Sequence, residues 1–127
     1  MINGVGVDLQ GYEGALIVAE VGAEGDTLGA SDHIQLELEE SEDDSTYADV
    51  ADADVIGTVT GTNTGTIAKI DAAAEAPAVH FASYIGAKRY LRVVDNRTGT
   101  HTNGTPTSAT IVRGHARHQP AGATQVP

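Results

Sequence analysis

The residue types of a hydrolytic triad occur together in the second half of this sequence. Ser83, His80 and Asp95 could supply a nucleophile, a general base and an orienting carboxylate. However, no Gly-x-Ser-x-Gly elbow surrounds the serine, and a chain with five histidines provides such combinations by chance. We therefore expect that the protein is not an enzyme.

Three other stretches invite a ligand-binding interpretation. His115 and His118 are spaced as zinc ligands can be, but no helix is predicted to present them and the chain has no cysteine. The acidic run 40–46 lacks the ligand spacing of an EF-hand. The glycine-rich loop 22–29 lacks the Gly-Lys-Ser/Thr sequence of a phosphate-binding loop and carries carboxylates instead. We expect no metal and no cofactor, and interpret the acidic run as a solvated hairpin.

Charge is distributed unequally along the chain, whose formal net charge is −11. Residues 1–76 carry 17 of the 18 carboxylates and one lysine, whereas residues 77–127 carry one carboxylate and six lysines or arginines. Either the two halves neutralise each other within one domain, or a basic edge docks on a partner while an acidic face meets solvent. The overall negative charge and the lack of aromatic residues among the basic ones argue against nucleic-acid binding.

Alternation of apolar and polar residues predicts a chain made of strands. The first nine residues suggest an edge strand, residues 12–21 a central strand, and residues 34–39 a strand whose polar face meets water or a basic partner. A hairpin is predicted from 55–59 and 66–70 and a final strand at 107–113, and the only helical fragment, 72–76, is too short to be stable alone.

The segment 84–94 is the predicted centre of the fold. Three of the five aromatic residues, Phe81, Tyr84 and Tyr90, lie in it or just before it, so we expect a core hairpin there. Along its second strand, Arg92 should share one sheet face with Tyr90, and residues 91, 93 and 95 should point to the other face.

These elements predict an all-β, β-sandwich or jelly-roll-like single domain with extended termini. We assign residues 1–113 to the sandwich and residues 114–127 to an extended C-terminal arm. Large apolar side chains are scarce while Gly, Ala, Thr and Val are abundant, which favours a subunit that completes its burial against neighbours. No stretch approaches the ~18 apolar residues of a membrane span, and no leader segment is evident, so we expect a protein made in the cytosol with no membrane association.

Four segments carry a resemblance to a known family: GYE at 11–13, VGAEGDTL at 21–28, YIGAKRYLRV at 84–93 and GHARH at 114–118. They resemble small β-rich structural proteins of tailed bacteriophages, prophages and gene-transfer particles that are capsid cement or decoration proteins. The resemblance spans nearly the whole chain, but its motifs are structural and include no catalytic set to transfer.

The resemblance implies a homo-oligomer, preferably a trimer rather than a dimer, bound to the major capsid protein on the outer surface of the virion capsid, where it would stabilise contacts between capsomers. Two alternatives stay open: a neck, tail or head-fibre-base component, and a small carbohydrate-binding module, although the chain has no Trp for sugar stacking. The basic residues and histidines of the second half are the candidates for contact with the capsid or another subunit: Arg89, Arg92, Arg113, His115, Arg117 and His118.

Overall fold

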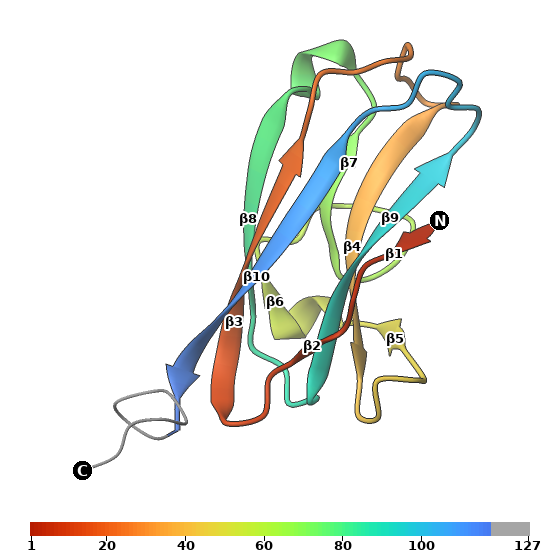
Figure 1. Cartoon of the computed structure of the whole chain (residues 1–127). Coiled ribbons are helices and arrows are strands. Elements are labelled where there is room, and N and C mark those ends of the chain that lie inside the picture. Colours follow the sequence, from red (N-terminus) through yellow and green to blue (C-terminus); the bar gives the residue numbers. More distant parts are fainter. Residues whose placement is uncertain (118–127) are drawn as a thin grey trace.

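The computed structural model describes residues 1–117, which form two antiparallel sheets packed face to face (Figure 1). This confirms the all-β single domain. The helical content of the described residues is two 3-10 turns, η1 (Asp52–Asp54) and η2 (Ala73–Glu75), and the second lies at the predicted helical fragment. The jelly-roll connectivity stays a prediction.

The first sheet, sheet A, is built on the pairing of its two longest strands, β4 (His33–Ser41) and β9 (Tyr90–Thr98). Short strands from the N-terminus, β1 (Ile2–Asn3) and β2 (Val7–Asp8), pair with β9 and form one edge, as the sequence predicts. On the other side, β5 (Ala48–Asp49) and β7 (Thr66–Ile70) both pair with β4.

The second sheet, sheet B, has β3 (Tyr12–Val21) in a central position, with the bounds predicted from its alternation. On one side lies β8 (Ala78–Tyr84), followed by the short β6 (Val55–Ile56). On the other side lies β10 (Thr107–Ala116), which forms the edge of this sheet (Figure 1).

The core lies between the sheets and is filled by the inward-facing alternate residues of each. Sheet B contributes Ile17 and Ala19, and sheet A contributes Ile34, Leu36 and Leu38, all at most 2% exposed. Burial of one such Leu or Ile side chain contributes about 2 kcal/mol. The period of two therefore gives each sheet an apolar inner face.

The predicted hairpin at 84–94 is wrong, because its two arms belong to different sheets. The chain leaves sheet B after Tyr84, crosses the end of the sandwich and enters sheet A at Tyr90. Alternation had indicated the two strands correctly, and the side-chain directions along β9 agree with the prediction, but alternation does not specify which strand pairs with which. Tyr84 is buried as a core residue should be, whereas Phe81 is 63% exposed on the outside of sheet B.

The predicted hairpin of 55–59 with 66–70 is also wrong, for the same reason. β6 pairs with β8 in sheet B, while β7 pairs with β4 in sheet A. The intervening residues 57–65 form a flap, joined to β7 by a hydrogen bond from the Val59 N–H to the Thr66 carbonyl oxygen at 2.9 Å.

The polar face of β4 was predicted to meet water or a basic partner, and Glu39 does meet one, Arg92. The flap explains why the rest of this face meets neither. Gln35 and Glu37 are at most 1% exposed, because the flap covers them. The amide of Gln35 donates to the Thr62 hydroxyl at 3.0 Å and its oxygen accepts from the Thr62 N–H at 2.7 Å. The Asn63 amide donates to both carboxylate oxygens of Glu37, at 3.1 and 3.2 Å. Gly61 permits this approach, since a Cβ there would lie 2.6 Å from the Gln35 side-chain oxygen.

The last strand runs further than predicted. Its pairing with β3 continues through Ala116, opposite Tyr12, and the Arg117 N–H donates to the Gly11 carbonyl oxygen at 2.8 Å. Residues 114–116 of the predicted arm therefore lie in sheet B. The remainder of that arm, residues 118–127, lies outside the described residues.

Candidate docking surfaces

The first two predicted contact residues, Arg89 and Arg92, are engaged by carboxylates of the same chain. Arg89 forms a two-pronged pair with Asp8, at 3.0 and 2.9 Å, and this pair holds the pKa of Asp8 at about 2. Arg92 lies 2.7 Å from Glu39 on the outer face of sheet A, and both side chains are less than 20% exposed. Neither arginine presents a free charge to a partner.

The remaining predicted contact residues gather near the end of β10. The Arg113 guanidinium stacks 4.6 Å from the Tyr12 ring centre, and Arg117 donates to Glu13 at 2.7 Å. His115 is exposed and has a φ of 54°. His118 lies outside the described residues.

Most of the basic charge of the second half is neutralised by carboxylates of the first half. Four of the six ion pairs of the described residues join the acidic half to the basic half: Asp8–Arg89, Glu13–Arg117, Glu39–Arg92 and Glu42–Lys88. The sheets achieve this by placing β9 and β10 beside the acidic strands β4 and β3. Of the two interpretations drawn from the sequence, the structure therefore supports neutralisation within the domain.

The structure separates the three residues of the hypothetical triad. Ser83 lies on β8 in sheet B, whereas Asp95 lies on β9 in sheet A, where it binds Arg97 at 2.8 Å and accepts from Thr107 at 2.7 Å. His80 has a buried Nε2 without a hydrogen-bond partner among residues 1–117. In that same part of the chain, no group of three or more His, Asp or Glu side chains could hold a metal ion. None of its helices is long and apolar enough to cross a membrane.

Most aromatic rings are already covered by other groups. Arginine guanidinium groups lie over the rings of Tyr12, Tyr47 and Tyr90, at 3.9 to 5.1 Å from the ring centres. Tyr84 is buried, and burial together with Glu40 raises its pKa. Phe81 is left as the aromatic residue whose ring is largely exposed, at 63%.

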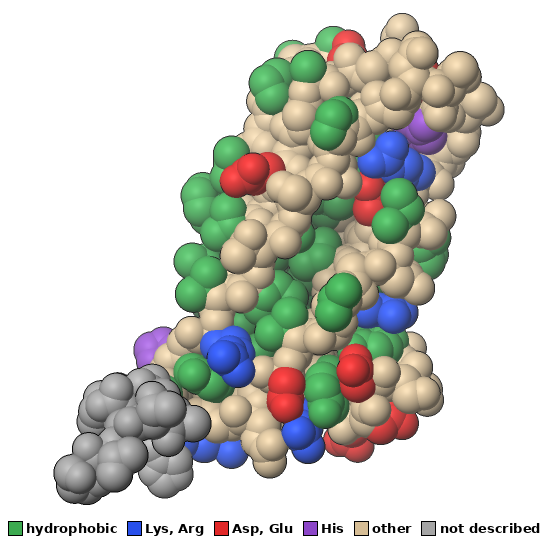
Figure 2. Space-filling view, in the orientation of Figure 1, with side chains coloured by type: hydrophobic (Ala, Val, Ile, Leu, Met, Phe, Trp, Pro, Cys, Tyr) green, Lys and Arg blue, Asp and Glu red, His purple; other side chains and the backbone are tan. Residues whose placement is uncertain are grey.

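The outer face of sheet B is an exposed apolar surface that was not predicted from the sequence. Register places outward-facing residues of neighbouring strands side by side: Leu16 lies opposite both Val112 and Ser83, and Phe81 lies opposite Val18. Figure 2 shows hydrophobic side chains along the β3–β8 side of the molecule. Five large apolar side chains of this surface are between 40% and 63% exposed: Leu16, Ile56, Val79, Phe81 and Val112. We call these five residues the apolar face.

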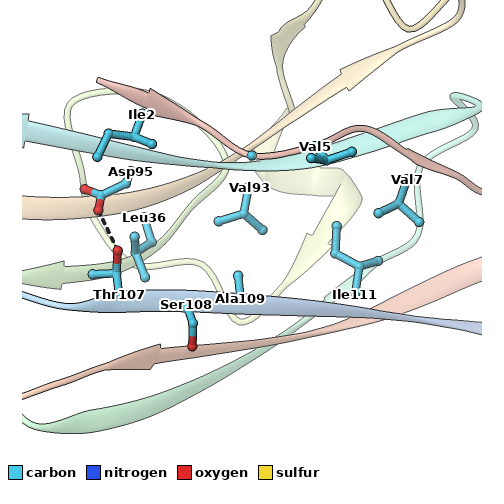
Figure 3. Close-up of a pocket in the computed structure, with 11 residues that line it drawn as sticks. Ile2, Val5, Val7, Leu36, Val93, Asp95, Thr107, Ser108, Ala109 and Ile111 are labelled. Atoms are coloured by element: carbon cyan, nitrogen blue, oxygen red, sulfur yellow. Dashed lines mark hydrogen bonds between the residues drawn. The ribbon is translucent and has the colours of Figure 1, made fainter.

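A groove of about 350 Å³ opens where the edges of the two sheets meet, between β10 and the N-terminal strands. Ala109 and Ile111 point into it from β10, toward Val93 and Val7 of sheet A (Figure 3). Ser108 points away from it. Hydrophobic side chains are visible at the bottom of this hollow in Figure 2. The sandwich is thus open along one side.

Alternation placed Leu16 and Phe81 on apolar strand faces, and Phe81 was expected in the core, but within residues 1–117 both side chains lie largely uncovered on the outside of sheet B. Comparisons of the chain with models of protein families, with curated proteins and with solved structures found no match. The surfaces themselves and the resemblance noted in the sequence are therefore what bears on function.

Proposed function

We propose that the chain is a structural virion protein, a capsid cement or decoration protein that lies on the outer surface of a phage head and stabilises contacts between capsomers. The single observation that carries this proposal is the apolar face of sheet B, an exposed surface on a domain whose lysines and arginines are mostly paired with its own carboxylates. Exposed apolar patches of this kind mark surfaces that bind other proteins. The sequence resemblance supplies the kind of partner, a major capsid protein.

The energetics favour docking through the apolar face rather than through the arginines. Exposed ion pairs contribute at most about 1 kcal/mol each and are weakened by salt. Covering Phe81 completely would contribute up to about 2 kcal/mol, and the four aliphatic side chains around it add to this. Attachment at many positions of a shell needs only modest affinity at each contact if the copies are linked to one another.

A charge introduced into the apolar face tests this proposal. Particles that lack the protein would be mixed with purified wild type, with Phe81→Lys, or with the control Val59→Lys, and then sedimented. Val59 is also exposed, at 43%, but it lies on the flap, away from the apolar face. We expect wild type and Val59→Lys to sediment with the particles at both low and high salt, and Phe81→Lys to stay in solution.

Circular dichroism and thermal melting of the two variants would establish that both retain the fold. If folded Phe81→Lys binds the particles as well as wild type does, the apolar face is not the docking surface. If wild type itself fails to bind, the assignment as a decoration protein is wrong.

A further inference from the structure

The outer edge of β10 is an exposed strand edge that lacks the usual protection against pairing. Within the described residues β10 pairs with β3 alone, so the backbone groups along its other side have no strand partner over residues 107–113. Exposed edges in natural proteins are blocked by lysines, prolines, bulges or covering loops. Here Pro106 precedes the stretch and the irregular His115 follows it, but the stretch itself contains one charged residue, Arg113, at its end.

The groove beside this edge is incomplete without a further strand. On the inner face of β10, Ala109 is exposed although its side chain points toward the interior of the sandwich. Across the groove, Ile2 is 59% exposed and Val5 is 86% exposed. A strand added to β10 would continue sheet B over the groove and place alternate side chains above these residues.

We propose that the added strand is β10 of a second copy, paired antiparallel across a two-fold axis at Thr110. This inference concerns the isolated protein and does not depend on docking to a shell. With the axis at Thr110, Ile111 of each copy lies opposite Ala109 of the other, so that a large side chain meets a small one above the groove. On the outer face, Val112 lies opposite Ser108.

Charge along β10 favours this antiparallel arrangement. One end of the strand carries Arg113, which forms no ion pair within residues 1–117, whereas Arg117 beyond it is paired with Glu13. At the other end Ser108 lies opposite Glu20 of β3, which is also without an ion-pair partner in that part of the chain, whereas Asp95 beside Thr107 is paired with Arg97. Antiparallel pairing brings the basic end of each copy to the acidic end of the other, whereas parallel pairing would place like charges together. An isologous contact of this kind closes as a dimer, which differs from the trimer expected from the sequence.

The pairing also extends the apolar face. Val112 belongs both to this face and to β10, so two copies of the face would lie on one continuous sheet. Because each copy carries a net charge of −11, long-range repulsion opposes association, and screening by salt should strengthen the dimer.

The experiment is sedimentation velocity on the isolated full chain over a range of concentrations. We expect a monomer–dimer equilibrium that shifts toward dimer at higher salt. Thr110→Lys places two lysines directly opposite each other at the axis and should weaken dimerisation at least about fivefold. Thr110→Glu should do the same, and a mixture of the two variants should recover a heterodimer. Thr60→Lys, on the exposed flap, is the matched control and should dimerise as wild type does.

A cysteine at the axis gives a second, independent readout, because the chain has no cysteine of its own. Residues directly opposite in an antiparallel pair have Cα atoms about 4.5–5.5 Å apart, within the reach of a disulfide. We expect Thr110→Cys to form a covalent dimer on oxidation and Thr60→Cys to form none, although Thr60→Cys should still associate non-covalently as wild type does. A wild type that is monomeric at all concentrations would overturn the proposal, as would a dimer that neither Thr110→Lys nor Thr110→Glu affects.

Discussion

Removing the hydroxyl group of Tyr84 should destabilise the domain more than removing any other tyrosine hydroxyl of the described residues. This hydroxyl donates to Glu40 at 2.6 Å and accepts from the Lys88 N–H at 3.1 Å, so it joins sheet A to the crossing segment that leaves sheet B. The Tyr84 ring is 1% exposed. Gly86 allows this packing, because a Cβ there would lie 2.5 Å from the hydroxyl oxygen.

The magnitude of the Tyr84→Phe effect follows from these contacts. A hydrogen bond to a charged group contributes about 1.5–3 kcal/mol, and the substitution also leaves the Lys88 N–H without its partner. We expect a loss of about 2 kcal/mol in the free energy of unfolding. For a domain of this size, that loss corresponds to a decrease in Tm of roughly 8 °C.

Urea denaturation and thermal melting of wild type, Tyr84→Phe and Tyr12→Phe measure this effect. Tyr12 is the matched control, because its hydroxyl makes no hydrogen bond within residues 1–117. The phenylalanine ring of the Tyr12→Phe variant would still stack with the Arg113 guanidinium. We expect the control to differ from wild type by less than about 0.5 kcal/mol. Equal losses for the two variants would refute the role assigned to the Tyr84 hydroxyl, and the crossing would then be held by packing alone.

Two further predictions concern carboxylates whose pKa values are shifted in opposite directions. Burial raises the pKa of Glu37, so stability is greatest below the unfolded pKa of the group and is lost as pH rises through its folded pKa. Glu37→Gln should therefore be more stable than wild type at pH 8, with a difference that disappears near pH 4 in urea titrations; a less stable variant at pH 8 would show that the amide donors outweigh burial. Hydrogen bonding to Arg89 lowers the pKa of Asp8 to about 2, so the stability it contributes is present above the unfolded pKa and lost as pH falls through about 2. Asp8→Asn should cost less than about 1 kcal/mol at pH 7, because the pair is more than a third exposed, and NMR titration of the Asp8 carboxyl should show the low pKa directly.

The sequence predicted those features that depend on neighbours along the chain. The bounds of β3 follow from its alternation, and the faces of β9 follow from the same period of two. The helix at Ala73–Glu75 is a single turn because the helical stretch of the sequence is short and Pro77 comes soon after it. In each case the local pattern and the tertiary environment favour the same structure.

Features that depend on distant partners could not be predicted. The two hairpins were wrong because alternation gives the face of a side chain but not the neighbouring strand. The burial of Glu37 was missed because the flap that covers it joins the two sheets instead of turning back as a hairpin. The pairing of Arg89 with Asp8 could not be predicted for the same reason. An acidic and a basic half of a sequence should attract each other, but their charges do not show which residues form ion pairs.

The copy number of the protein in purified particles tests the proposed function most directly. The measurement is quantitative gel densitometry or mass spectrometry of the chain against the major capsid protein of the same particles. A cement or decoration protein covers the shell, so we expect a copy number of the same order as that of the major capsid protein. A copy number of about a dozen or fewer would place the protein at the neck or tail, and its absence from the particles would contradict a virion role altogether.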